Sequence, residues 1–277
     1  MTQKFYIFGD SQADMRATRW GRIGKVLKEY LVSKGWESIF GEMKSEKNGK
    51  AGATIGRWTK SGAQKNNLVS ALGQSPKLLF LIIGGNDQNV DEGDTKKAVK
   101  DLVRLVFDKA PDSTLVWVGP PIIVGRGKPL GFSLDRQGPN SWSTSEGEIR
   151  FILNKRIHDA LEEMMATGNE RMYNGTAYMP LEAGTPLLDK KVVFINGVTQ
   201  WEDLYPELGR LTGDGLERPY IPQIDEDGKP SYAGTLTIKS STNKYDGVHI
   251  DEAHAREAVN NLMTKWKSKF WPDDPYN

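Results

Sequence analysis

The sequence predicts an α/β fold in which helices cover both faces of a central parallel sheet of about five strands. Three observations support this prediction. Strand-like and helix-like segments alternate up to residue 118. The strongest strand, 78–83, is apolar at every position, as expected of a strand buried on both faces. Several strands end at glycine and small polar residues, and right-handed crossovers between such units give a parallel sheet between helical layers.

The elements up to residue 118 follow from the spacing of apolar residues. Residues 5–8 are four apolar residues that end at Gly9, which is typical of a buried strand that runs into a tight turn. The expected strands of this part are 4–8, 36–43, 78–83 and 115–118. The expected helices, in which apolar residues recur every three or four positions, are 19–34, roughly 59–73 and 94–109.

Residues 125–242 show a less regular pattern, and we expect them to contain a long insertion that shapes the substrate site. Within this region a helix is expected at 145–165. Ser145 would be its N-cap, with Glu148 at the capping-box position. Residues 192–195 are the expected fifth parallel strand.

Two further elements are expected towards the end of the sequence. A hairpin is predicted around Asp227-Gly228, because this pair favours a tight turn. The last helix, 251–270, should pack inward through four apolar residues, namely Ala255, Ala258, Val259 and Leu262. No linker divides the sequence, so we expect a single domain over residues 1–277.

Composition narrows the possible partners. With 37 basic and 36 acidic side chains, the net charge of +1 gives no reason to expect nucleic acid or an anionic membrane as partner. No apolar stretch approaches the length that spans a bilayer. The absence of cysteine excludes disulfides, thiolate metal sites and cysteine nucleophiles. Residues 1–4 lead straight into the first strand, so no cleaved signal peptide is expected, which would suit a cytoplasmic enzyme or a component of a phage particle.

Three apolar or glycine-containing segments end in small polar clusters, which are Gly9-Asp10-Ser11, Gly52-Ala53-Thr54 and Gly84-Gly85-Asn86-Asp87. The carboxyl ends of parallel strands lie at one edge of a sheet, so these clusters can converge. A serine at this edge can act as a nucleophile if a base activates it and hydrogen-bond donors stabilise the oxyanion. Taken alone, Gly-Asp-Ser is equally typical of an ordinary turn or a helix N-cap.

A fourth cluster, Tyr245-Asp246-Gly247-Val248-His249, precedes the last helix. We expect a turn here, in which the Asp246 carboxylate reaches Nδ1 of His249 while Nε2 faces outward. Ser11 would then attack an acyl carbon, and His249 would act as general base and then as general acid. Asp246 would hold the imidazole tautomer and stabilise the imidazolium. The sequence therefore contains the side chains that acyl transfer requires.

Three groups are expected to bind the oxyanion: the backbone amides of Ser11 and Gly52 and the side-chain amide of Asn86. Gly49 and Gly56 compete with Gly52 for this role, because each is a glycine in the same stretch. Asn86 could instead cap the segment that follows it.

The four clusters together resemble the ordered blocks of SGNH/GDSL-type serine hydrolases, which carry Ser, Gly, Asn and His. The blocks read Gly9-Asp10-Ser11-Gln12, Gly52-Ala53-Thr54, Gly84-Gly85-Asn86-Asp87 and Asp246-Gly247-Val248-His249. The resemblance covers roughly 1–124 and 243–270, and it departs at Gln12, where the best-known first block has leucine. It implies a three-layer α/β/α flavodoxin-like fold, no metal or other cofactor, and ester substrates that range from lipids to O-acetylated sugars.

Other polar and aromatic residues have plainer interpretations. Asp87 is expected to hydrogen-bond nearby backbone rather than to take part in catalysis. His158 and His254 fall within predicted helices, without a paired acid in a turn, and are expected to be solvated. The aromatic residues of the irregular region either pack this region against the rest of the protein or stack on sugar rings. They include Trp201, Tyr205, Tyr220 and Tyr232.

These observations predict a serine esterase that removes short acyl groups, with O-acetyl groups on a carbohydrate as the expected substrate. The preference for a sugar ester rests on the polar irregular region with its Trp and Tyr residues and on the lack of a long apolar segment suited to a fatty chain. Two alternatives stay open. One is a lipase- or thioesterase-like hydrolase of longer acyl chains, and the other is a non-catalytic glycan-binding or phage structural protein that retains the fold.

Overall fold

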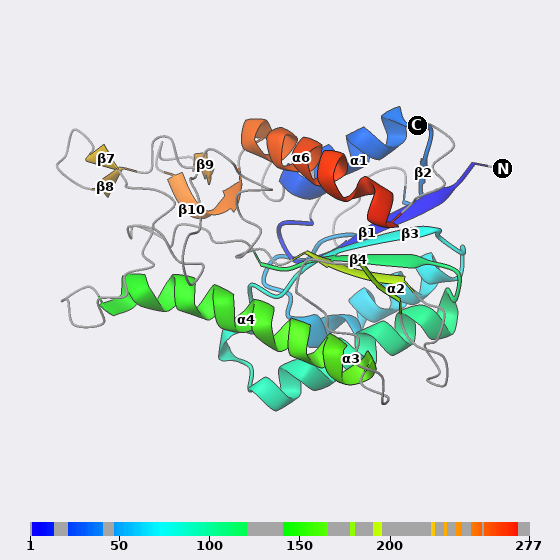
Figure 1. Ribbon diagram of the computed structural model, residues 1–277, viewed down its shortest axis with the longest axis horizontal. Helices are drawn as coiled ribbons and strands as arrows, with labels where there is room; N and C mark the ends of the chain where they lie inside the picture. The colour runs from blue at the N-terminus through cyan, green and yellow to red at the C-terminus, as the bar shows by residue number, and fades with distance from the viewer. Residues whose placement is uncertain are drawn as a thin grey trace.

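The computed structural model in Figure 1 places one large sheet between two layers of helices. The residues that the structure describes are 2–13, 22–40, 47–120, 141–165, 178–180, 191–195, 223–224, 230–231, 237–239, 245–250 and 252–270. Every structural statement below concerns these residues.

The large sheet has six strands in the order β2-β1-β3-β4-β6-β5. Their bounds are β1 Lys4–Gly9, β2 Glu37–Ser38, β3 Leu78–Ile82, β4 Thr114–Val118, β5 Tyr178–Pro180 and β6 Lys191–Ile195. The first five in the sheet order are parallel, and β5 pairs with β6 in the antiparallel sense at the edge. The parallel part has the strand order of flavodoxin-like sheets, which confirms the predicted fold class.

Helices cover both faces of this sheet (Figure 1). On one face, α1 (Arg22–Ser33) packs against α6 (Glu252–Phe270). On the other face lie α2 (Ala63–Leu72), α3 (Glu92–Lys109) and α4 (Ser141–Met165), and α3 contacts both of the others. Two short 3-10 helices, η1 (Ile55–Trp58) and η2 (Asp87–Asn89), follow the second and third polar clusters.

The core is built from strands that are buried on both faces. Every residue of β3 is at most 1% exposed, which agrees with its uniformly apolar sequence. In β1 the side chains alternate: Tyr6 and Phe8 join the cluster formed with α2, α3 and α4, and Phe8 packs edge-on against Trp58. The four predicted inward residues of α6 are all buried, as expected. No helix among the described residues is both long and apolar enough to cross a bilayer.

Several predicted boundaries were wrong. Helix α4 begins at Ser141, so Ser145 and Glu148 lie inside the helix and are not its capping box. Residues 141–144 contain no helix-breaking residue, so the helix extends to Ser141, close after Pro139. A Ser-x-x-Glu pattern also occurs within helices. The weak helix predicted at 59–73 is shorter: α2 begins at Ala63, after a turn that contains Gly62, and η1 lies before the predicted range.

Two small antiparallel sheets lie beside the large one, beyond its left-hand end in Figure 1. Strands β7 (Gln223–Ile224) and β8 (Pro230–Ser231) flank Asp227-Gly228, which confirms strand pairing across the predicted hairpin. Strand β9 (Thr237–Lys239) pairs with β10 (Tyr245–Ile250), and sequence patterning missed both. Strand β5 was missed as well, because three residues that end in a proline carry almost no periodic signal.

Candidate active site

The turn that follows β1, residues 9–13, presents Ser11 at the edge of the sheet; we call it the Ser11 turn. Gly9 has φ +152°, and a Cβ at this position would lie 2.0 Å from the carbonyl oxygen of Ile82, so the neighbouring strand leaves room only for glycine. The Asp10 amide donates to that same oxygen (3.0 Å). The Asp10 carboxylate accepts the Gln12 amide (2.8 Å), which closes the turn around a half-buried Ser11.

Helix α1 supports the Ser11 turn from behind. The amide of Gly24, in the first turn of this helix, donates to the carbonyl oxygen of Gln12 (3.1 Å). The first amides of a helix have no partner within the helix, so this contact satisfies one of them and anchors the turn. Ser11 is therefore fixed on both sides, by β3 through Asp10 and by α1 through Gln12.

The loop at residues 48–55, called the Gly52 loop below, runs beside the end of β1. Gly9 donates to the Asn48 carbonyl oxygen (2.9 Å) and accepts the Lys50 amide (3.1 Å), so Gly49 forms a parallel bridge with Gly9. Gly52 lies in the next turn, exposed and at φ +73°. The rival Gly56 lies within η1. The geometry thus leaves Gly52 as the glycine of this loop that faces solvent beside the Ser11 turn.

The side chain of Asn86 joins three of the four predicted clusters. Its Nδ2 donates to the Ala53 carbonyl oxygen in the Gly52 loop (3.1 Å) and lies 3.5 Å from Oδ2 of Asp10 in the Ser11 turn. Asn86 is half-buried and directly precedes η2. Asn86 therefore links the Gly52 loop to the Ser11 turn, whereas a shared site of Ser11, Gly52 and Asn86 stays a prediction.

Asp246 and His249 do not lie in a turn, contrary to the prediction. Both belong to β10, whose register against β9 shifts between Tyr245 and Ile250, so the strand is irregular at this point. Their backbone is described but their side chains lie outside the described part. Strand β10 contacts α1, the helix that supports the Ser11 turn. The contact of His249 with Ser11 stays a prediction.

Asp87 is a buried carboxyl group next to Asn86, and its side chain is 1% exposed. Both of its oxygens accept the Ile55 amide, at 3.1 and 3.2 Å, so the expectation that it bonds nearby backbone is confirmed. Burial raises the pKa of Asp87 to about 7; the Ile55 amide opposes this shift, and the negative charge of Asp10 adds to it.

The raised pKa of Asp87 predicts a pH effect on stability. An unfolded aspartate loses its proton near pH 4, whereas folded Asp87 keeps it until about pH 7, so unfolding becomes easier as the pH rises through this window. Asp87→Asn has no titratable carboxyl group at this position. From pH 5 to pH 8 its free energy of unfolding should therefore gain about 2.5 kcal/mol relative to the wild type. Urea unfolding at both pH values measures this gain, and Asp94→Asn, at an exposed position, is the control. Equal pH dependence of wild type and Asp87→Asn would contradict it.

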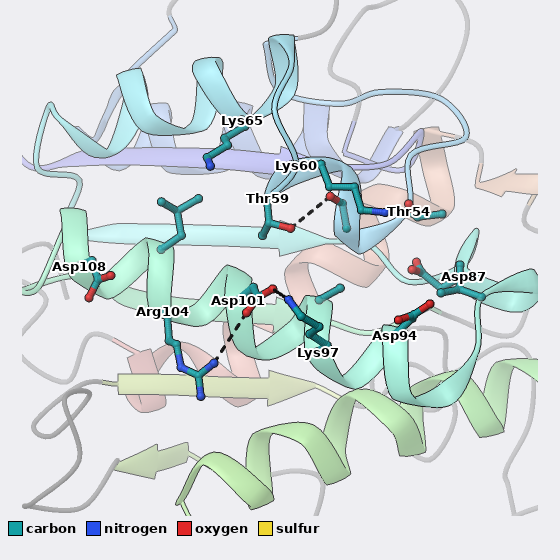
Figure 2. Close-up of a pocket in the computed structure, with 14 residues that line it drawn as sticks. Thr54, Thr59, Lys60, Lys65, Asp87, Asp94, Lys97, Asp101, Arg104 and Asp108 are labelled. Carbon is teal, nitrogen blue, oxygen red and sulfur yellow. Dashed lines mark hydrogen bonds and ion pairs between the residues drawn. The ribbon is translucent and has the colours of Figure 1, made fainter.

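A groove of about 680 Å³ begins beside this cluster and runs between α3 and the η1–α2 segment (Figure 2). Thr54 and Asp87 line one end of it, next to the proposed oxyanion donors. Its charged lining residues are Lys60, Lys65, Asp87, Asp94, Lys97, Asp101, Arg104 and Asp108. Ion pairs hold part of this lining in place: Asp101 pairs with Lys97 (2.5 Å) and Arg104 (3.7 Å). The groove thus combines charged side chains with apolar ones, namely Val90, Ala98 and Leu105, and sequence patterning gave no sign of it.

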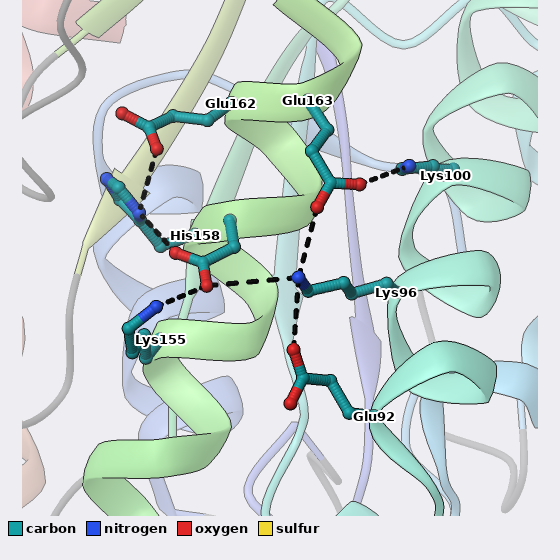
Figure 3. Close-up of polar contacts among 8 residues, drawn as sticks. Glu92, Lys96, Lys100, Lys155, His158, Glu162 and Glu163 are labelled. Atoms are coloured by element: carbon teal, nitrogen blue, oxygen red, sulfur yellow. Dashed lines mark hydrogen bonds and ion pairs between the residues drawn. The ribbon is translucent and has the colours of Figure 1, made fainter.

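A second polar cluster joins α3 and α4 (Figure 3). Lys96 on α3 contacts Glu92 (3.0 Å) and Glu163 on α4 (3.0 Å), and Lys100 also pairs with Glu163. His158 is not the solvated residue that we expected: it is half-buried, and its Nδ1 lies 3.3 Å from Asp159.

Within the described residues, His158, Asp159 and Glu162 form a group whose ligand atoms could reach one metal ion. Asp159 already pairs with Lys155 and approaches Lys96, and such cations would compete with a metal for its carboxylate. We therefore assign this cluster a role in packing α3 against α4. The side chain of His254 lies outside the described part.

The model of the family described as GDSL-like lipase/acylhydrolase matches residues 5–266. No curated protein sequence matches the chain. Among solved structures, the chain is similar to the protein YxiM from Bacillus subtilis, with a TM-score of 0.50 and 14% identity, over 97% of this chain and 57% of that chain. At this identity the likeness bears on the fold alone.

Two other solved structures are more distant in shape. A family 3 carbohydrate esterase from Clostridium thermocellum matches with a TM-score of 0.45 and 14% identity, over 98% of each chain. A peptidoglycan O-acetylesterase matches with a TM-score of 0.40 and 15% identity, over 80% of this chain. The chain spans 45% of that second protein, and thus about half the length of two of the three structures named.

Proposed function

The chain belongs to the GDSL-like lipase/acylhydrolase family and is a hydrolase of carboxylic esters, and from this premise we propose that it removes short acyl groups, chiefly acetyl, from a carbohydrate. The observation that carries the proposal is that the Asn86 side chain contacts both Asp10 and the Ala53 carbonyl oxygen, which supports a common site for Ser11, Gly52 and Asn86.

In the proposed reaction Ser11 is the nucleophile. Its Oγ attacks the ester carbon while His249 takes the hydroxyl proton, and a tetrahedral oxyanion forms. The oxyanion collapses, the alcohol leaves with the proton from His249, and the acyl group stays on Ser11. A water molecule, deprotonated by His249, then releases the acid and restores Ser11. Asp246 would orient the imidazole, as the order of the four clusters suggests.

Two donors outside the Ser11 turn would stabilise the oxyanion. Ala53 accepts one N–H of the Asn86 amide and so orients the group. The contact of Nδ2 with Asp10 is 3.5 Å long, beyond the usual range for an N–H···O bond, so the second N–H is only weakly engaged and can donate to an oxyanion instead. Gly52 would supply its backbone amide from the exposed turn. Each such donor is typically worth about 3–4 kcal/mol in the barrier.

The polar groove supports a hydroxyl-rich substrate. It starts at Thr54 and Asp87, and its walls offer both cationic donors and carboxylate acceptors, which sugar hydroxyl groups can use in turn. Basic and acidic side chains nearly balance, so the groove has no strong preference for an anionic or a cationic polymer. A fatty acyl chain could contact Val90, Ala98 and Leu105, but it would also displace water from the charged side chains beside them, which opposes its binding.

Acyl-chain preference tests this substrate class. We expect the ratio of kcat/KM for p-nitrophenyl acetate to that for p-nitrophenyl octanoate to exceed about 10, because an octanoyl chain in the groove would displace water from charged side chains without replacing the lost hydrogen bonds. Acetate release from O-acetylated xylan gives the second measurement. A preference for octanoate would overturn the sugar-acetyl proposal and favour the lipase-like alternative.

A further inference from the structure

Asp87 is a buried titratable group to which the proposed reaction gives no role. It follows Asn86 directly, opens η2, and is 1% exposed. Two backbone bonds fix its position: its amide donates to the Gly84 carbonyl oxygen (3.2 Å), and its own carbonyl oxygen accepts the Val90 amide (3.0 Å). The Asp87 backbone is fixed in this way at the start of the groove. Its carboxyl group can therefore fix the position of a backbone group that it binds.

The contacts of Asn86 and Asp87 with the Gly52 loop form a reciprocal pair. Asn86 donates from its side chain to the Ala53 carbonyl oxygen (3.1 Å). Asp87 accepts the Ile55 amide on both carboxyl oxygens (3.1 and 3.2 Å). Two consecutive residues thus hold the loop at two points that are two residues apart, one through a carbonyl and one through an amide. These two bonds hold the Ala53–Ile55 end of the Gly52 loop in place relative to Asn86.

We propose that Asp87 is a positioning residue: its carboxyl group holds the Ile55 amide and thereby keeps the Gly52 donor at the distance from Asn86 at which both can bind one oxyanion. This inference rests on the proposed function, because it concerns the same oxyanion. Asp87 itself touches no reacting atom in the scheme. Its effect passes through the backbone of the Gly52 loop.

The charge state of Asp87 matters here, because a carboxyl group that lies close to an oxyanion would repel it if both carried a full negative charge. Charged groups on the elements packed around it are Asp10 at the end of β1, Lys60 after η1, Asp94 and Lys97 on α3, and Arg156 on α4. A second full negative charge next to Asp10 would oppose the oxyanion. Burial keeps Asp87 partly protonated near neutral pH, so the group accepts a hydrogen bond at a reduced charge. A neutral amide should therefore replace it.

The experiment compares Asp87→Ala with Asp87→Asn on p-nitrophenyl acetate. The alanine variant loses the acceptor for Ile55, and we expect kcat to fall about 30-fold with KM changed less than 3-fold, because misplacing a catalytic donor by about 1 Å can cost up to 10²-fold. Inhibition by methylboronic acid, which forms a tetrahedral adduct on a serine, should weaken by a similar factor. The asparagine variant keeps an acceptor oxygen and should retain kcat within about 5-fold. Asp112→Ala, at an exposed position outside the groove, is the matched control and should match the wild type.

Three outcomes would overturn the inference. They are a kcat of Asp87→Ala within 3-fold of wild type, a loss in Asp87→Asn as large as in Asp87→Ala, and a loss confined to KM. Thermal melts show whether each variant is folded, and if Asp87→Ala does not fold, Asp87→Asn alone decides, because a 30-fold loss there contradicts the acceptor role. Ser11→Ala distinguishes the proposed function from the positioning role. If Ser11→Ala stays active, the proposed function fails. If Ser11→Ala is inactive while Asp87→Ala is fully active, only the positioning role is refuted.

Discussion

Replacing Ser11 with alanine is expected to lower kcat for p-nitrophenyl acetate by at least about 10⁴-fold, which is the loss typical of removing the nucleophile of a serine hydrolase. The Ser11 turn explains why this change should spare the fold. Its geometry depends on Gly9, on the Asp10 carboxylate that accepts the Gln12 amide, and on the bond from Gly24 to Gln12. None of these contacts uses the Ser11 hydroxyl group. The thermal melting temperature should therefore stay close to that of the wild type.

The control for Ser11→Ala is Ser70→Ala, at an exposed position on α2, which should leave kcat unchanged. The double variant Ser11→Ala with His249→Ala tests whether the two residues act as a unit. Residues of one catalytic group lose activity together, so the double variant should be no slower than either single one. If Ser11→Ala kept wild-type activity, the nucleophile would have to be sought elsewhere in the chain.

Asn86→Ala should give the second largest effect, a fall in kcat of about 10²- to 10³-fold with little change in KM. The side-chain amide acts on charge that develops only in the transition state, so its loss affects kcat more than substrate binding. The substitution also removes the bond to the Ala53 carbonyl oxygen, which orients the Gly52 loop. Steady-state kinetics on p-nitrophenyl acetate measure the effect.

Asn89→Ala is the matched control for Asn86→Ala, because it changes the same residue type three positions later at an exposed position of η2. Its kcat should stay within 2-fold of the wild type. A loss in Asn86→Ala below 5-fold would mean that Asn86 is not an oxyanion donor. The structure already speaks against a capping bond in the ordinary sense, since the Asn86 side chain makes no N-cap hydrogen bond to η2.

Some errors of the sequence-based prediction have a common cause. The Ser-x-x-Glu pattern at Ser145 was interpreted as a helix start, and the cluster at 245–249 as a turn, because both judgements used short motifs without their surroundings. A capping motif can equally lie within a helix, and a glycine between polar residues can equally lie in an irregular strand. In β10 the pairing with β9 decided the outcome, and that partner lies outside any local window.

Patterning along the chain was enough for the parallel strands of the large sheet and for the polar clusters that follow β1 and β3. The apolar run of β3 and the periodic apolar residues of α1, α3 and α6 reflect which faces of these elements are buried. The spacing of apolar residues is a local property of the sequence, so patterning can detect it. The polar residues at the ends of β1 and β3 followed, because a parallel sheet brings its carboxyl ends together whatever the details of packing.

Only the tertiary structure decided how those residues are held. The Ile55 amide bonds to Asp87, which is 32 residues away in the sequence, and Asn86 approaches Asp10, which is 76 residues away. Neither contact produces a periodic pattern in the sequence. The burial that raises the pKa of Asp87, and the groove between α3 and the η1–α2 segment, likewise arise from elements that meet only in the folded chain. Hydrogen-bond partners and electrostatic environments depend on which surfaces come into contact, and the sequence alone does not encode that in any local pattern.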